Sequence, residues 1–132
     1  MKPQKIAKAY TELRCTFDGR AIVPDISVFQ WYRIPRNSDG SVANLFSIAP
    51  DWTIEILSPD QSQIKVMKNI LHCMNSGTEI GWMIYPKERS VIVYLPDQLP
   101  VVYDLPNMAL PMPSFATRYS LTVGELFGWL ME

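Results

Sequence analysis

Two acidic residues, Asp25 and Glu55, lie within runs of apolar and β-branched residues at 23–28 and 50–59. Strands of this composition usually belong to a core, where an unpaired carboxylate is costly. If the two carboxylates converge from neighbouring strands, they indicate a divalent metal site, and the backbone carbonyl of Ile56 could add a further oxygen ligand. Otherwise, Asp25 is a turn residue at the start of a strand, and Glu55 points to solvent from one face of a sheet.

The second candidates are Lys65 and Lys68, on the helix predicted after the Glu55 strand. An ammonium group beside a metal-bound carboxylate can orient an attacking water and neutralise charge that develops on a phosphate. The alternative is a solvated helix face, which is the usual environment of lysines. His72, the only histidine, has no residue near it in the sequence that resembles a nucleophile. The sequence also contains neither a Gly-x-Ser-x-Gly motif nor a Gly-rich phosphate loop.

Length, charge and cysteine content set bounds on the function. The 132 residues are enough for a single domain, 1–132. A formal net charge of −1 gives no support for a DNA partner, so DNA binding would need a local basic patch. Two cysteines without a disulfide framework or zinc spacing fit a reducing cytoplasm. No run approaches the roughly 18 apolar residues of a membrane span, so we expect a cytoplasmic protein without a membrane partner.

Turn and cap signals divide the chain into predicted elements. Residues 2–12 are expected to form a short helical turn. The strands at 13–17 and 21–31 are expected to form a hairpin, which Pro24 interrupts just before Asp25. A loop at 33–49 precedes further strands, predicted at 52–57, 80–85, 90–95 and 101–103.

Two helices complete the predicted pattern. The first spans 62–76, between a Ser62 cap and Gly77, and its buried stripe is predicted to be Ile64, Met67, Leu71 and Met74. The last begins at Thr122, where Glu125 completes a capping box. This order of strands and helices predicts a mixed α/β or α+β layer fold.

The acidic residues and their surroundings resemble a known family. The chain has Pro24-Asp25, then Asp51-x-x-x-Glu55-x-Leu57-Ser58-Pro59, a helix, and Gly77-x-x-x-x-Trp82-x-x-x-Pro86 with a hairpin strand. This pattern is similar to the restriction-endonuclease-like nucleases of unknown function that are widespread in cyanobacteria, a branch of the PD-(D/E)xK nuclease superfamily. The resemblance implies a restriction-endonuclease-like core, DNA as the partner, and a phosphodiesterase site that uses Mg²⁺ or, alternatively, Mn²⁺. Asp25 matches the aspartate of the motif and Glu55 its second acidic residue.

The chain departs from the family pattern at the lysine. The motif lysine should lie two residues after Glu55, where this sequence has Leu57. In this branch the lysine is thought to have moved to the following helix, where Asn69 aligns with it. Lys68 stands one residue earlier, which shifts its direction by about 100° around the helix, and Lys65 is an alternative donor. Tyr85 occupies a position where the family often has an aspartate.

A second departure concerns the N-terminus. Members of the family usually carry a helical region before the first strand, whereas about a dozen residues precede Leu13 here. A shortened or missing helix would expose apolar sheet surface, which favours pairing with another chain as a homodimer.

Three functions remain open from the sequence. The first is a Mg²⁺-dependent DNA endonuclease in which Asp25 and Glu55 hold the metal and Lys68 or Lys65 assists the attacking water. The second is a catalytically degenerate relative that acts as an interaction or dimerisation module, since Leu57 and Asn69 occupy the lysine positions. The third is a small-molecule binder with a pocket beneath the aromatic residues.

Overall fold

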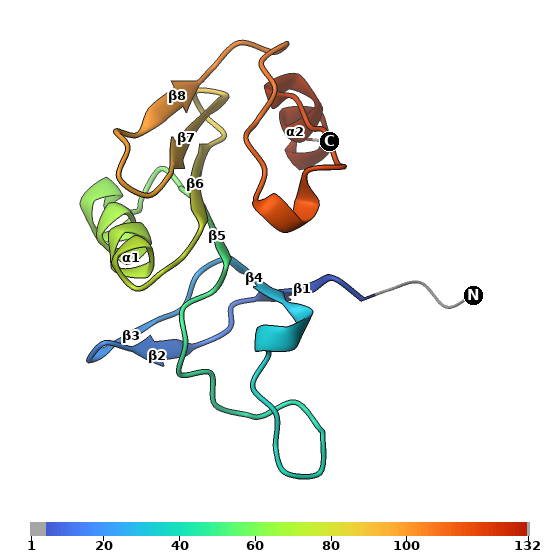
Figure 1. Ribbon diagram of the computed structural model, residues 1–132. Coiled ribbons are helices and arrows are strands. Elements are labelled where there is room, and N and C mark those ends of the chain that lie inside the picture. The colour runs from blue at the N-terminus through green and yellow to red at the C-terminus, as the bar shows by residue number, and fades with distance from the viewer. Residues whose placement is uncertain (1–4, 132) are drawn as a thin grey trace.

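The computed structural model describes residues 5–131 of the chain. The strands in this part are β1 Ala7–Thr11, β2 Cys15–Phe17, β3 Arg20–Ile22, β4 Ile26–Gln30, β5 Trp52–Ile56, β6 Ile80–Tyr85, β7 Ser90–Tyr94 and β8 Val101–Tyr103. The helices are α1 Gln63–Asn75 and α2 Val123–Leu130, with short 3-10 helices at Trp31–Arg33 and Ser114–Ala116. Six strands form one mixed sheet in the order β1-β4-β5-β6-β7-β8, and β2 and β3 form a separate hairpin (Figure 1). The mixed α/β prediction is therefore confirmed.

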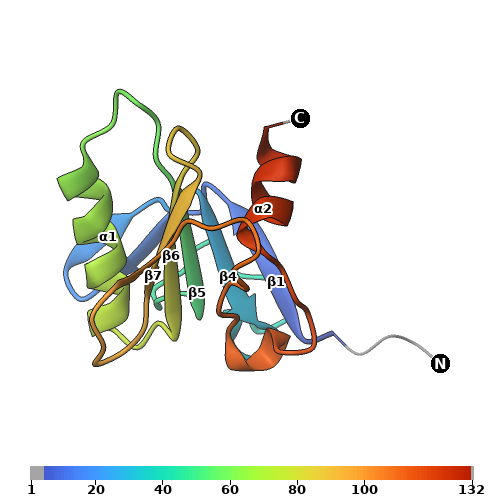
Figure 2. The same ribbon diagram turned by 90° about the horizontal axis from the view of Figure 1, so that it is seen from above.

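The sheet separates two packing layers (Figure 2). On one face, Ile54 and Trp82 pack against Phe127 of α2. On the other face lie α1 and the β2–β3 hairpin, with Met83 packed against Val66 of α1. Successive strand residues point to opposite faces of a sheet, and Glu55 pairs with Met83 across β5 and β6. Glu55 therefore lies on the α1 face.

One edge of the sheet gathers the ends of four strands. β5 and β6 are parallel and joined by α1, so their C-terminal ends reach the same edge. β4 is antiparallel to β5 and begins at this edge, directly after Asp25. β1 is antiparallel to β4 and ends at this edge, at Thr11. The β6–β7 turn at 86–89 belongs to the same edge. We call this the site edge, because it carries both candidate acidic residues.

Helix α1 begins where the sequence predicts, but its buried side is rotated. Ser62 caps the helix by accepting a hydrogen bond from the Lys65 N–H, as expected. The fully buried residues are Val66, Ile70 and Cys73, whereas Ile64 is 59% exposed and Leu71 42% exposed. The predicted stripe was wrong for Ile64 and Leu71, whereas Met67 and Met74 are partly buried against the core, and the centre of the buried side is rotated by roughly 100° around the helix. Apolar residues occupy about half of the circumference, so periodicity alone did not identify which part of it meets the sheet.

The N-terminal third of the chain differs most from the prediction. Residues 7–11 form the edge strand β1 rather than a helical turn, while residues 1–4 lie outside the described part. The predicted strand 21–31 is two strands that belong to different sheets, β3 in the hairpin and β4 in the main sheet. Proline has no N–H to donate to a ladder, and the buried Pro24 lies between these two strands. The break just before Asp25 was thus predicted, but not the change of sheet.

No helix within residues 5–131 is long and apolar enough to cross a membrane.

Candidate metal site

Asp25 and Glu55 meet at the site edge. The Asp25 N–H donates to Glu55 Oε1 at 3.0 Å, and the Ile56 N–H donates to Asp25 Oδ2 at 2.6 Å. Glu55 therefore binds the backbone of Asp25, and Asp25 binds the backbone of the residue after Glu55, which holds both carboxylates at the junction of β4 and β5. The interpretation of Glu55 as a solvent-facing residue was wrong, because Glu55 is 5% exposed.

The burial of Glu55 carries an electrostatic cost. Burial, and secondarily the negative charge of Asp25, raise the pKa of the Glu55 carboxyl from 4.5 to about 7, although the Asp25 N–H partly offsets both effects. No cation among residues 5–131 contributes to lowering this pKa. A buried carboxylate next to a second carboxylate, without a compensating positive charge, is the environment that a bound cation would stabilise.

The backbone N–H and C=O groups of Ile56 point toward the Asp25 side of β5. Within a strand, the N–H and C=O groups of one residue point toward the same neighbouring strand, and the Ile56 N–H points to Asp25. The antiparallel pairing of Ile26 with Ile54, continued by two residues, sets Pro24 opposite Ile56. Because Pro24 has no N–H, β4 offers no ladder donor to the Ile56 carbonyl oxygen at this position. This oxygen is therefore a candidate third ligand.

These oxygen atoms fit the requirements of Mg²⁺. The ion usually binds to one or two carboxylates, and water and substrate phosphates complete its coordination. Residues 5–131 contain no group of three or more His, Cys, Asp or Glu side chains that could hold a metal. The arrangement thus matches a hard cation shared with substrate and does not match a closed zinc site.

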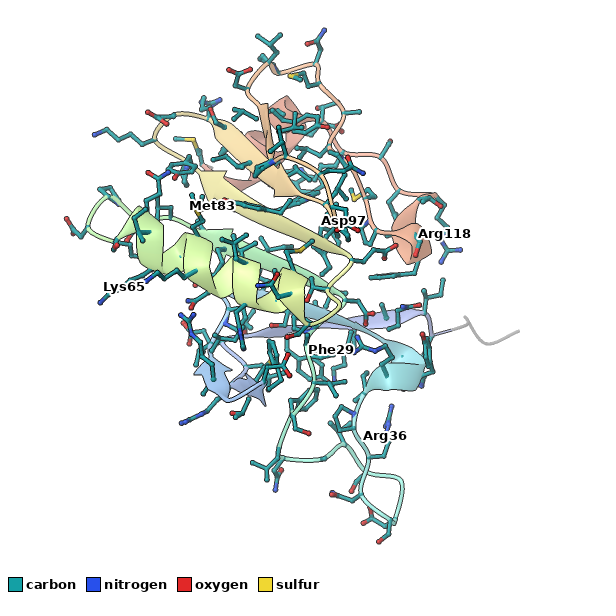
Figure 3. The ribbon with its side chains drawn as sticks, turned by 60° about the vertical axis from the view of Figure 1, so that its left-hand side comes forward. Phe29, Arg36, Lys65, Met83, Asp97 and Arg118 are labelled. Atoms are coloured by element: carbon teal, nitrogen blue, oxygen red, sulfur yellow. The ribbon has the colours of Figure 1, made fainter. Side chains whose placement is uncertain are left out.

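The two candidate lysines point in different directions from α1. Lys68 lies about 200° around the helix from the buried Val66 and faces away from the sheet. Lys65 lies one turn before Asn69, on the side of α1 that meets the β2–β3 hairpin. Both side chains are exposed. Figure 3 shows Lys65 near the N-terminal end of α1, which is the end closest to the site edge.

Asn69, which aligns with the family lysine, is level with Glu55. Cys73 contacts Thr53, and α1 runs antiparallel to β5. Four helical residues span about 6 Å and two strand residues about 6.6 Å. Asn69 is four residues before Cys73, and Glu55 is two residues after Thr53. Asn69 and Glu55 therefore lie at the same position along the direction of β5. Its Oδ1 accepts a hydrogen bond from Arg20 of the hairpin at 2.6 Å.

Arg20 is a residue that the sequence analysis missed. Its guanidinium comes from the first residue of β3, 49 residues away from Asn69 in the sequence, and no local pattern could have paired the two. The hairpin is further fixed by Phe17, whose ring stacks on His72 with ring centroids 4.4 Å apart and whose carbonyl oxygen lies 2.9 Å from His72 Nε2. Ser76 also donates to Asp18. His72 is therefore a packing residue.

Asp51, the other acidic residue of the motif, has a structural role. It is buried and forms an ion pair with Arg33 at 2.8 Å. It also accepts hydrogen bonds from the backbone and side chain of Gln30. Asp51 precedes β5 and therefore lies at the opposite end of that strand from the carboxylate pair.

This fold, with two carboxylates at the edge of a mixed sheet, can now be compared with known proteins. A crystal structure described as that of a "putative nuclease belonging to DUF820" from Anabaena variabilis matches with a TM-score of 0.95 and 59% identity over 97% of this chain and 72% of that chain. The Uma2 family, described as "Putative restriction endonuclease", matches residues 1–124. The chain belongs to the Uma2 family. A search of curated proteins found no significant match.

Proposed function

We propose that this protein is a Mg²⁺-dependent DNA endonuclease of the PD-(D/E)xK type. The observation that carries the proposal is the convergence of the Asp25 and Glu55 carboxylates, in which Glu55 accepts a hydrogen bond from the Asp25 N–H and Asp25 accepts one from the Ile56 N–H. Membership of the Uma2 family and similarity to a nuclease structure support DNA as the substrate.

Each residue of the pair has a distinct part in the proposed site. Asp25 presents its Oδ1 atom while Oδ2 is held by the Ile56 N–H, and Glu55 presents Oε2 while Oε1 is held by the Asp25 N–H. The carbonyl oxygen of Ile56 supplies the third protein ligand. A bound Mg²⁺ would polarise a phosphoryl oxygen and lower the pKa of a coordinated water. Mn²⁺, which accepts the same oxygen ligands, is the alternative ion.

Lys65 is the better placed of the two lysines to contact a phosphate group. One turn before Asn69, it is level with Leu57, the position two residues beyond Glu55. Lys68 faces away from the sheet and would contact the substrate only outside the site. Lys65→Gln should therefore reduce cleavage more than Lys68→Gln.

The second candidate function is a non-catalytic interaction or dimerisation module. The observation that favours it is the bond between Asn69 and Arg20, because the position that aligns with the family lysine holds the hairpin in place instead of presenting an ammonium group. Pairing as a homodimer through the outer edge of β1, which is an edge strand of the six-stranded sheet, belongs to this proposal.

A cleavage assay separates the two candidates. Plasmid DNA is incubated with Mg²⁺ and the parent protein, Asp25→Asn, Glu55→Gln or the matched control Asp60→Asn, which changes an exposed carboxylate in the loop after β5. The proposal expects cleavage by the parent and the control, and a loss of at least about 100-fold in both site variants. Equal cleavage by all four proteins, or none by the parent, would reject the endonuclease function.

A further inference from the structure

A cavity lies at the site edge, beyond the end of β5. It measures about 330 Å³ and is bounded by the loop after β5, the start of α1 and the β6–β7 turn. Leu57, which is two residues beyond Glu55, forms part of its wall. The lining also includes side chains with hydrogen-bonding or charged groups, namely Ser58, Gln61, Gln63, Tyr85, Lys87 and Glu88.

Tyr85 lines this cavity and carries a hydroxyl donor that is not used elsewhere in the described chain. The Tyr85 hydroxyl is buried and has no hydrogen-bond partner in the part of the chain that the structure describes. A tyrosine hydroxyl is protonated at neutral pH, and burial and the charge of Glu88 raise the pKa of this phenol further. A buried hydroxyl without a partner is unfavourable, and an acceptor on a ligand would relieve the cost.

The cavity is lined by one cationic and one anionic side chain, and the start of α1 adds partial positive charge. Lys87 supplies an ammonium group at the rim, and Gln63 belongs to the first turn of α1, which contains no acidic residue. The N–H groups at the start of this 13-residue helix carry a partial positive charge that no carboxylate of that turn offsets. Glu88 opposes these groups, since its exposed carboxylate also lines the cavity.

We infer that this cavity binds a phosphate group of the nucleic-acid strand, next to the phosphate held at the Asp25–Glu55 pair. The inference rests on the proposed function for its substrate, and it assigns positions that the metal site does not use. Tyr85 and Lys87 donate to the phosphate oxygens, and Glu88 weakens binding by repulsion.

Binding of a fluorescein-labelled DNA oligonucleotide in EDTA, measured by anisotropy at fixed salt, tests the inference without requiring cleavage. Lys87→Gln should weaken binding about 3- to 10-fold and reduce the salt slope by about 1. Glu88→Gln should tighten binding about 2- to 5-fold, because it removes an opposing charge. Arg36→Gln, which removes an exposed cation in the loop after β4, far from the cavity, is the matched control and should bind like the parent.

Tyr85→Phe separates a binding role from a structural one. It should weaken binding about 2- to 10-fold through loss of one hydrogen bond. It should not lower the free energy of unfolding, because the hydroxyl has no partner in the described chain. A variant that loses stability but binds DNA normally would show that the hydroxyl is structural and would contradict the inference.

The outcomes distinguish this inference from the proposed function. Unchanged affinity in the Tyr85, Lys87 and Glu88 variants overturns the inference even if the parent cleaves DNA. A parent that binds DNA through these residues but does not cleave it with Mg²⁺ overturns only the proposed function. Competition with inorganic phosphate identifies the source of the anion: an oligonucleotide that binds no tighter than free phosphate would overturn the assignment to a nucleic-acid strand.

Discussion

Replacing Glu55 by Gln should stabilise the metal-free protein at alkaline pH. The Glu55 carboxyl has a raised pKa of about 7 in the folded chain, compared with an ordinary value of 4.5. Below the ordinary value, the carboxyl is protonated in both the folded and unfolded states. As the pH rises from 4.5 to about 7, the Glu55 carboxyl ionises in the unfolded chain before it ionises in the folded chain. The parent therefore loses stability until the pH passes about 7. The difference between the two pKa values corresponds to a loss of about 3 kcal/mol in the free energy of unfolding.

The glutamine variant avoids this loss because its amide is neutral at every pH. Its side-chain oxygen can still accept the hydrogen bond from the Asp25 N–H that Glu55 Oε1 accepts in the parent. Glu55→Gln and the parent should therefore have similar free energies of unfolding near pH 4.5. Near pH 8, the variant should be more stable by up to about 3 kcal/mol.

Urea denaturation in EDTA at the two pH values measures this difference directly. Glu88→Gln, which replaces an exposed carboxylate, is the matched control and should follow the parent. Mg²⁺ at about 100 times its dissociation constant should then return about 2.7 kcal/mol to the parent at pH 8, but nothing to Glu55→Gln. If Glu55→Gln were instead less stable than the parent at pH 8 without metal, the carboxylate would have a stabilising partner, and the electrostatic reasoning would be refuted.

Three further substitutions test how the fold supports the site. Arg33→Gln leaves Asp51 buried without its ion pair, so the free energy of unfolding should fall by about 2–4 kcal/mol. The dissociation constant for Mg²⁺ should stay unchanged, and a shift in metal affinity would show that Asp51 acts on the site. Gly81→Ala places a Cβ 2.8 Å from Ile70 Cγ2 and should lower the free energy of unfolding by about 1–3 kcal/mol. This loss should be smaller in an Ile70→Ala background, and additive effects of the two substitutions in urea denaturation would contradict the predicted clash. Thr122→Ala removes the capping box of α2 and should lower stability by about 1 kcal/mol, with a loss below 0.3 kcal/mol arguing against the cap.

The central part of the fold followed from local sequence signals. The strands after position 50, the helix that Ser62 caps and the final capped helix all lie close to their predicted positions, because turns, caps and apolar runs mark their ends. The pairing of Asp25 with Glu55 could be raised only as a question. Its answer depends on the register of β4 against β5, which is a long-range property that no local pattern encodes.

The features that sequence reasoning missed depend on contacts between distant segments. Arg20 reaches Asn69 only because the β2–β3 hairpin folds over α1, and nothing near either residue signals this contact. The buried side of α1 was misplaced because its apolar residues extend beyond a single stripe, so the sheet, rather than periodicity, selects Val66 and Ile70. Tyr85 looked like a lost acidic residue, and only the structure shows its unpartnered hydroxyl beside a cavity.

Calorimetric titration with Mg²⁺ and Mn²⁺ tests the central claim most directly, because the claim is that two carboxylates share one cation. The account predicts that the parent binds one ion per chain with millimolar or tighter affinity, and that Asp25→Asn and Glu55→Gln each abolish binding while Asp60→Asn retains it. Asp25→Asn keeps an oxygen that can accept the Ile56 N–H, so its loss of binding would reflect the missing charge. No binding by the parent, or equal binding by the Asp25 and Glu55 variants, would contradict the account.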